Sequence, residues 1–173
     1  MLFRSRPALV LFVGGHDSGK TTLIEDLVPR LSALGLAVGA IKHTSRHVED
    51  DVVGKDSHRL GVLGCDVWAL LTPERAAVWR KIGEAPLAEL VRREFSGFDL
   101  VVIEGYKSLP IPKIEVARSG ASRPPISDAL ARICDTPAED SVPTYRFDDS
   151  EGIVSAVLRL AGLDRIGRAR ADS

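Results

Sequence analysis

The chain alternates between continuous apolar runs and segments with helical spacing. The runs at 8–13 (ALVLFV) and 100–103 (LVVI) are typical of strands buried on both faces of a parallel sheet. Apolar residues three and four positions apart predict a helix over 23–34, and Gly35 is placed to end it. Pro29 lies inside this pattern, so we expect a kink or a local break there.

The rest of the chain continues this alternation. A capping box formed by Asp148 and Glu151 predicts the start of the last helix. Pro73 and Glu74 form the turn of a predicted β-hairpin. Further strands are expected over 36–41, 113–117 and 130–133, hairpin strands over 66–72 and 76–81, helices over 57–63 and 86–95, and a long polar loop over 43–56.

Composition narrows the class of protein. The 173 residues are 45% hydrophobic and 27% charged, as in ordinary globular domains. The 23 Lys and Arg nearly cancel the 24 Asp and Glu, which argues against nucleic acid as a partner. No apolar run reaches the roughly 18 residues of a membrane-spanning helix, and the N-terminal apolar stretch is too short for a signal peptide. We therefore expect a cytoplasmic protein without a membrane partner.

A glycine-rich loop follows the first apolar run. Residues 14–21 read GGHDSGKT and match the G-x-x-x-x-G-K-[ST] pattern of phosphate-binding loops. The backbone N–H groups of such a loop converge on phosphate oxygens, and glycine is needed where a side chain would clash. Lys20 is expected to reach the β- and γ-phosphates, and the Thr21 hydroxyl to bind Mg²⁺. The predicted nucleotide-binding residues here are Gly14, Gly15, His16, Asp17, Ser18, Gly19, Lys20, Thr21 and Thr22.

The loop lies between a predicted buried strand and an amphipathic helix, which argues against a chance match in a glycine-rich turn. We therefore predict an α/β fold of the P-loop NTPase type. Its mainly parallel sheet is flanked by helices and carries a β-hairpin insertion. One nucleotide-binding domain is expected over 1–163, followed by a frayed tail over 164–173.

Two carboxylates are candidates to support the loop. Glu104 directly follows the apolar run at 100–103, where P-loop proteins hold the water shell of Mg²⁺, although an exposed strand end is the simpler alternative. Asp56, in the segment GKDS, could bind Mg²⁺ or position water, or could simply cap the next helix. Lys20, Asp56 and Glu104 are the predicted catalytic residues.

Other polar residues are expected near the same edge of the sheet. Lys42 and His43 end the second predicted strand, on the carboxyl edge where ligands bind, or they form a solvated strand end. Lys55 could contact a phosphate or an anion of a partner. His43, His47, His58 and Cys65 together could bind zinc or nickel, but their spacing matches no tight metal motif, which favours solvated or substrate-facing histidines.

The identity of the base stays open at the level of motifs. The guanine-reading N-K-x-D motif is absent from the chain. Asp135, after the apolar run near residue 133, is a candidate replacement, and Asp128 is a second one. The residues by themselves therefore predict a Mg²⁺-dependent purine nucleotide site.

Four stretches together resemble the molybdopterin-guanine dinucleotide biosynthesis protein B (MobB) family. They are GGHDSGKTTL from Gly14, AIKHTSRHVEDDVVGKDSHR from Ala40, TPERAAV from Thr72 and VVIEGYKSLPIPKIEV from Val101. The resemblance implies a GTP- and Mg²⁺-binding homodimer with weak GTPase activity. It also implies a MobA-type guanylyltransferase as partner, other molybdenum cofactor proteins as further partners, and a cofactor or partner surface at Lys42, His43, Lys55 and Lys107.

Two other functions are alternatives. A small-molecule kinase would need an arginine-rich lid, for which Arg118, Arg123 and Arg132 are candidates. A GTP-switched metal chaperone would use the histidines and Cys65. The hairpin at 66–81 has exposed edges that could pair across a dimer.

Overall fold

The computed structural model describes residues 6–44, 64–80, 86–118, 125–135 and 142–164. The chain divides into two compact units. The first is formed by Met1–His43 and Val91–Ser173, and the second by Thr44–Leu90.

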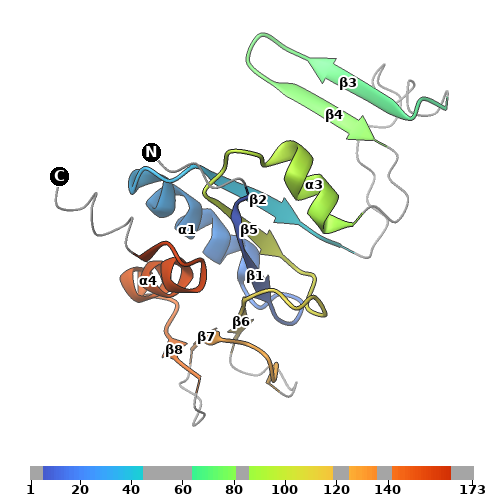
Figure 1. Ribbon diagram of the computed structural model, residues 1–173. Helices are drawn as coiled ribbons and strands as arrows, with labels where there is room; N and C mark the ends of the chain where they lie inside the picture. The colour runs from blue at the N-terminus through green and yellow to red at the C-terminus, as the bar shows by residue number, and fades with distance from the viewer. Residues whose placement is uncertain (1–5, 45–63, 81–85, 119–124, 136–141, 165–173) are drawn as a thin grey trace. The chain divides into compact units, whose positions relative to one another are not determined.

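A six-stranded sheet is the centre of the first unit (Figure 1). Its strands lie in the order β2-β5-β1-β6-β7-β8, and every adjacent pair is parallel. The elements confirm the predicted α/β fold with a mainly parallel sheet. The strands are β1 (Ala8–Val13), β2 (Val38–Lys42), β5 (Leu100–Glu104), β6 (Lys113–Ala117), β7 (Ala131–Cys134) and β8 (Thr144–Tyr145).

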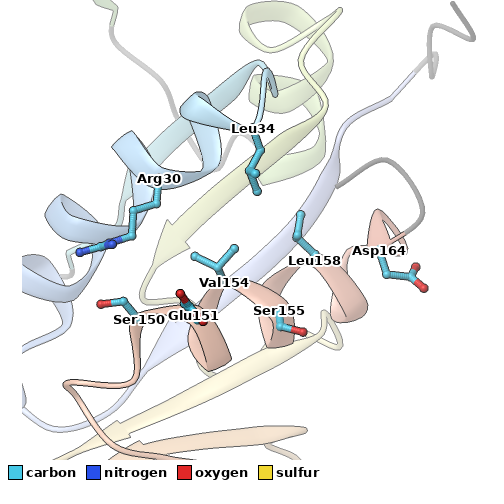
Figure 2. A pocket seen from close by; sticks show the side chains of 8 residues that line it. All are labelled: Arg30, Leu34, Ser150, Glu151, Val154, Ser155, Leu158 and Asp164. Atoms are coloured by element: carbon cyan, nitrogen blue, oxygen red, sulfur yellow. The ribbon is translucent and has the colours of Figure 1, made fainter. Parts of the chain in front are cut away.

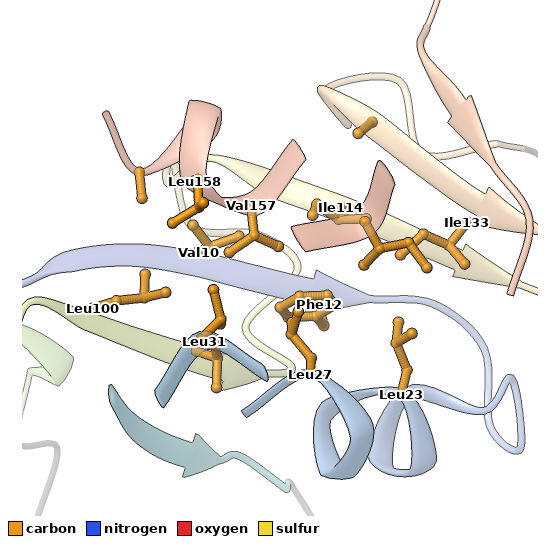
Figure 3. Close-up of a cluster of buried hydrophobic side chains, with 14 of the residues drawn as sticks. Val10, Phe12, Leu23, Leu27, Leu31, Leu100, Ile114, Ile133, Val157 and Leu158 are labelled. Carbon is orange, nitrogen blue, oxygen red and sulfur yellow. The ribbon is translucent and has the colours of Figure 1, made fainter. Parts of the chain in front are cut away.

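Two helices cover one face of this sheet. Helices α1 (Lys20–Ala33) and α4 (Ser150–Leu160) place Leu27, Leu31 and Val157 against Val10 and Phe12 of β1, in one cluster of buried side chains (Figure 3). The opposite face is buried as well. Helix α3 (Leu87–Glu94) is followed by Phe95, whose ring lies 2.4 Å from where a Cβ of Gly39 in β2 would be. Burial on both faces explains the continuous apolar runs.

Two predictions about the first helix and the second strand need correction. Helix α1 is not broken at Pro29. Proline has no N–H to donate to the Glu25 carbonyl, but Glu25 and Pro29 both lie on the exposed side of the helix, where water can take that place. Strand β2 starts at Val38 instead of residue 36, because the Ala37 N–H donates to the Asp99 carboxylate at 2.8 Å and turns the chain there.

The last helix begins one residue later than predicted. Asp149, not Asp148, is its N-cap, and its carboxylate accepts a hydrogen bond from the Gly152 N–H at 2.9 Å. Asp148 pairs instead with Arg146 at 3.2 Å. The short strand β8 was not predicted, since two residues are too few to form a pattern.

The second unit contains a two-stranded antiparallel ribbon, as predicted. Strands β3 (Val67–Leu71) and β4 (Ala76–Arg80) are joined by a turn in which the Thr72 N–H donates to the Arg75 carbonyl at 2.8 Å. Trp68 and Trp79 stack on one face, with ring centroids 6.1 Å apart. The predicted polar loop beyond Thr44 and the helix over 57–63 lie outside the described residues. Within the described part of the chain, no helix combines the length and apolarity needed to cross a bilayer.

Candidate functional site

The glycine-rich loop joins β1 to α1 at the carboxyl edge of the sheet. Gly14 has φ 156° and Gly19 has φ 88°, both in the region that favours glycine. A Cβ on Gly14 would lie 2.1 Å from the Val116 carbonyl oxygen of β6, so only glycine fits against that strand. Asp17, with φ 55°, turns the tip of the loop, and its carboxylate pairs with His16 at 2.7 Å on the exposed side. The backbone is therefore shaped as the motif requires.

Lys20 folds back over this loop. Its ammonium donates to the Gly15 carbonyl at 2.5 Å and to the Ser18 hydroxyl at 3.0 Å, and Ser18 is 4% exposed. Burial lowers the pKa of Lys20 from its usual value; the Glu104 carboxylate opposes this shift and the Lys42 ammonium adds to it. The side chain thus spans the hollow of the loop, where a phosphate would accept the same hydrogen bonds.

Thr21, Lys42 and Glu104 meet beside the loop. The Thr21 hydroxyl donates to Glu104 Oε2 at 2.9 Å. Lys42 Nζ lies 3.1 Å from Thr21 Oγ1 and 3.4 Å from Glu104 Oε2. The Thr21 hydroxyl of α1 and the Glu104 carboxylate of β5 therefore both contact one cation, the Lys42 ammonium. This donor set fits Mg²⁺, which prefers oxygen ligands and few protein groups.

His43 and the segment after β5 form a second contact at this edge. The His43 ring stacks on Tyr106, with centroids 3.8 Å apart. Gly105 (φ 107°) and Tyr106 (φ 53°) turn the chain sharply, and a Cβ on Gly105 would lie 3.1 Å from the His43 carbonyl oxygen. Lys107 has an exposed side chain, and its carbonyl accepts a hydrogen bond from Lys113. The EGYK motif therefore holds His43 in place.

Several predicted residues cannot be placed. Lys55, Asp56, His47 and His58 lie outside the described residues. Among the residues that are described, no three His, Cys, Asp or Glu side chains gather as a metal site would require. The proposed histidine and cysteine cluster therefore stays a prediction.

The other side of the loop holds a group that the sequence reasoning did not assemble. Arg118, at the end of β6, lies over the Phe147 ring, 4.5 Å from its centroid. Its Nη1 is 4.0 Å from Asp135 Oδ1, at the end of β7. A Cβ on Gly19 would lie 3.1 Å from Arg118 Nε. Phe147 is not among the predicted site residues, because its place in the FDD before the last helix does not reveal that its ring meets Arg118.

Two residues considered for binding are engaged in the fold. Asp128 pairs with the buried Lys113 ammonium at 2.5 Å, and this hydrogen bond lowers the pKa of the carboxyl group. Arg132, a candidate for a kinase lid, is 4% exposed and donates to Glu115 at 2.8 Å. Arg123 lies outside the described residues, so the predicted arginines are not assembled into a lid in the described part of the chain.

A cavity of about 320 Å³ lies elsewhere, between α1 and α4 (Figure 2). It contains none of the predicted site residues and opens beside the last turns of α1. Its lining residues are Arg30, Leu34, Ser150, Glu151, Val154, Ser155, Leu158 and Asp164. The geometry therefore favours the carboxyl edge of the sheet as the functional site.

Comparison with known proteins agrees with this geometry. Residues 9–135 match the family model "Molybdopterin guanine dinucleotide synthesis protein B". The molybdopterin-guanine dinucleotide biosynthesis adapter protein of Escherichia coli is 32% identical over 87% of this chain and 91% of its own length. The Haemophilus influenzae protein of the same name is 34% identical over 72% and 71%. The crystal structure of Bacillus subtilis MobB superposes with a TM-score of 0.73 at 26% identity, covering 89% of this chain and 98% of that one. With its loop, sheet and length all in agreement, the chain belongs to the MobB family.

Proposed function

We propose that this protein binds GTP with Mg²⁺ at the glycine-rich loop and acts as an adapter in the formation of molybdopterin guanine dinucleotide. The observation that carries the proposal is the Thr21–Glu104 hydrogen bond beside the loop. A P-loop hydroxyl and a carboxylate at the end of a second strand are the pair that holds Mg²⁺ in such sites. The related adapter proteins supply the pathway.

Each residue has a proposed role. Lys20 and the loop N–H groups bind the β- and γ-phosphates, and Thr21 with Glu104 holds Mg²⁺, which neutralises phosphate charge when it is bound. Lys42, which lies beside Thr21 and Glu104, would contact the phosphates if Mg²⁺ occupied its present place. Asp135 accepts hydrogen bonds from the base.

Hydrolysis is proposed to be slow. The best catalysts of this class use an arginine finger or a glutamine that orients water, and such a group is worth about 10³–10⁵ in rate. The sequence offers Asp56 for positioning water, and we propose that GTP serves mainly as a bound ligand or switch. The protein then works beside a MobA-type guanylyltransferase in the cytoplasm, together with other molybdenum cofactor proteins. Lys42, His43, Lys55 and Lys107 contribute to the surface for the cofactor or partner.

A homodimer through the ribbon completes the proposal. Strand residues Leu71 and Val78 are 76% and 61% exposed, which is unusual for apolar side chains in paired strands. A second copy of the ribbon would cover this apolar surface and the free strand edges.

Titration with fluorescent GTP and ATP analogues, with and without Mg²⁺, tests the proposal. We expect GTP to bind more tightly than ATP and Mg²⁺ to increase the affinity. Lys20→Ala should weaken GTP binding by roughly 10- to 150-fold, because it removes a hydrogen bond from a charged donor to phosphate. Arg93→Ala is the control, since Arg93 is exposed on α3 and, among the described residues, pairs with its neighbour Glu94.

Other outcomes identify the alternatives. A preference for ATP would contradict the guanine assignment while leaving the phosphate loop intact. Transfer of phosphate to an acceptor faster than release of free phosphate would favour the kinase. Tight binding of zinc or nickel, lost in a His47 and His58 double variant, would favour the metal chaperone.

A further inference from the structure

The glycine-rich loop divides the carboxyl edge of the sheet into two halves. It follows β1, which has β5 and β2 on one side and β6 and β7 on the other (Figure 1). Glu104 and Lys42 end β5 and β2, so the metal and the terminal phosphates belong to that half. The phosphate chain is anchored by the loop between the halves. The nucleoside therefore extends toward the ends of β6 and β7.

Arg118 is held at that place by two contacts. Its guanidinium carbon lies 4.5 Å from the centroid of the Phe147 ring. Its Nε and Nη2 would lie 3.1 Å and 3.3 Å from a Cβ on Gly19, and Phe147 Cε1 would lie 3.5 Å from the same point. Gly19 thus lets the guanidinium settle against the last turn of the phosphate loop. The side chain still leaves 52% of its surface exposed, so one side is available to a ligand.

Asp135 lies next to this guanidinium, at the end of the neighbouring strand. Its Oδ1 is 4.0 Å from Arg118 Nη1, and its side chain is 37% exposed. Arg146 Nη1 donates to the Asp135 carbonyl at 3.3 Å, which fixes the backbone at this position. A planar cation and a carboxylate acceptor are therefore side by side, on the half of the edge without the metal ligands.

We propose that Arg118, supported by Phe147, is the surface on which the purine base stacks, and that Asp135 beside it reads the edge of the base. This inference rests on the proposed nucleotide function and specifies its base subsite. The planar guanidinium stacks on aromatic rings, and the Phe147 ring on its other side keeps it from turning away. The guanine edge offers two N–H donors to a carboxylate, whereas the adenine edge would oppose a ring nitrogen lone pair to it.

Calorimetric titration with three ligands tests this subsite. The ligands are GTP, ATP and inorganic tripolyphosphate, each with Mg²⁺, because tripolyphosphate has the phosphates but no base. Arg118→Ala should weaken GTP by about 5- to 150-fold, the range measured for loss of one base-stacking side chain. Its affinity for tripolyphosphate should stay within about twofold of the wild type, because the phosphate loop is intact.

Three further variants sharpen the test. Arg118→Lys keeps the charge but loses the plane, so it should lose most of the same affinity. Phe147→Ala should weaken GTP less, because it removes only the support. Asp135→Asn should lower the ratio of GTP to ATP affinity. Arg93→Ala, an exposed arginine paired with a carboxylate elsewhere, should change nothing. Thermal unfolding checks that each variant is folded.

The outcomes separate this inference from the proposed function. Equal loss of GTP and tripolyphosphate affinity in Arg118→Ala would make Arg118 a phosphate ligand and overturn the stacking role. Unchanged GTP affinity, or a wild type that binds tripolyphosphate as well as GTP, would overturn it too. If the wild type prefers ATP, the guanine function and the role of Asp135 fail. Arg118 is still the stacking surface in that case if its variant loses ATP but not tripolyphosphate.

Discussion

The six-stranded sheet and the two-stranded ribbon both contain apolar side chains, but the sheet buries them and the ribbon exposes them. In β1, Val10, Leu11 and Phe12 point to alternate faces and are all 0% exposed. In the ribbon, Leu71 and Val78 are 76% and 61% exposed. Apolar composition alone therefore does not state which strands end up inside. Helices α1 and α4 cover the sheet within its own unit, whereas a two-stranded ribbon by itself is only marginally stable in water and gains from a partner.

The largest expected contrast is in the response to truncation. Phe12→Ala should lower the free energy of unfolding by about 3–5 kcal/mol, because it leaves a cavity in the buried cluster. Leu71→Ala should change it by no more than about 0.5 kcal/mol at a protein concentration low enough to keep the chain monomeric, as at other exposed sites. Urea unfolding followed by circular dichroism measures both. A loss above 2 kcal/mol for Leu71→Ala would mean that the ribbon has a core of its own.

A buried ion pair gives the next effect within the sheet. Glu115 and Arg132 are 7% and 4% exposed, and the Glu115 carboxylate also accepts from the Ile126 N–H at 3.2 Å. Glu115→Gln should destabilise the protein by about 3 kcal/mol, because it removes the carboxylate charge that the buried Arg132 guanidinium faces. The exposed Arg30–Asp26 pair is the reference, and Arg30→Ala should cost much less, because water screens that pair. Equal losses in urea unfolding would show that burial does not govern the difference.

Substitutions in the ribbon should change the monomer–dimer equilibrium more than the free energy of unfolding. Leu71 and Val78 lie on one face of the ribbon. Val78 is directly opposite Ala69, and Ala69 is two residues from Leu71 in β3, so both point to the same side. Leu71→Lys with Val78→Lys should shift the protein toward monomer in sedimentation, because like charges would face each other in the proposed dimer. Glu74→Lys, in the turn, is the matched control. Dimers that persist in the double variant would exclude this face as the interface.

The smallest effect is expected at a pair with one exposed partner: Lys113 of β6 is buried, but the Asp128 side chain is 62% exposed, so water screens the pair. The Lys113 hydrogen bond lowers the pKa of Asp128 below its usual value of 3.8, so its contribution to stability is present above that pH. This contribution is lost as the pH falls through the lowered value. Asp128→Asn should therefore be less stable than the wild type at pH 7, and the two thermal midpoints should converge in strong acid. A constant gap at all pH values would contradict an ionic origin.

Much of the fold could be predicted from the chain because its signals are local. Buried strands such as β1 and β5 read as continuous apolar runs, and the glycine-rich loop is a contiguous motif. Strand β8 was missed because two residues carry no periodicity. The cap was misplaced by one residue because Asp148 and Asp149 offer the same chemistry, and only the backbone turn selects between them.

The site divides in the same way. The sequence predicts Thr21 and Glu104 as Mg²⁺ ligands because each occupies a position known from P-loop proteins, and in the fold these two residues, 83 positions apart, share a hydrogen bond. The contact of Arg118 with Phe147 was not foreseen, because it depends on where three separate loops end in space. The spacing of residues along the chain does not predict this contact.

The position of Lys42 changes how ligand entry at the loop should be viewed. The Lys42 ammonium bridges Thr21 and Glu104, and the Lys20 ammonium bridges Gly15 and Ser18. In the proposed complex, Mg²⁺ would take the place of the Lys42 ammonium, and phosphate oxygens would accept the hydrogen bonds that Lys20 donates to Gly15 and Ser18. This exchange would require rotation of the Lys20 and Lys42 side chains and no change of the backbone. The cation positions around the glycine-rich loop are thus taken by two lysine ammonium groups of the protein itself.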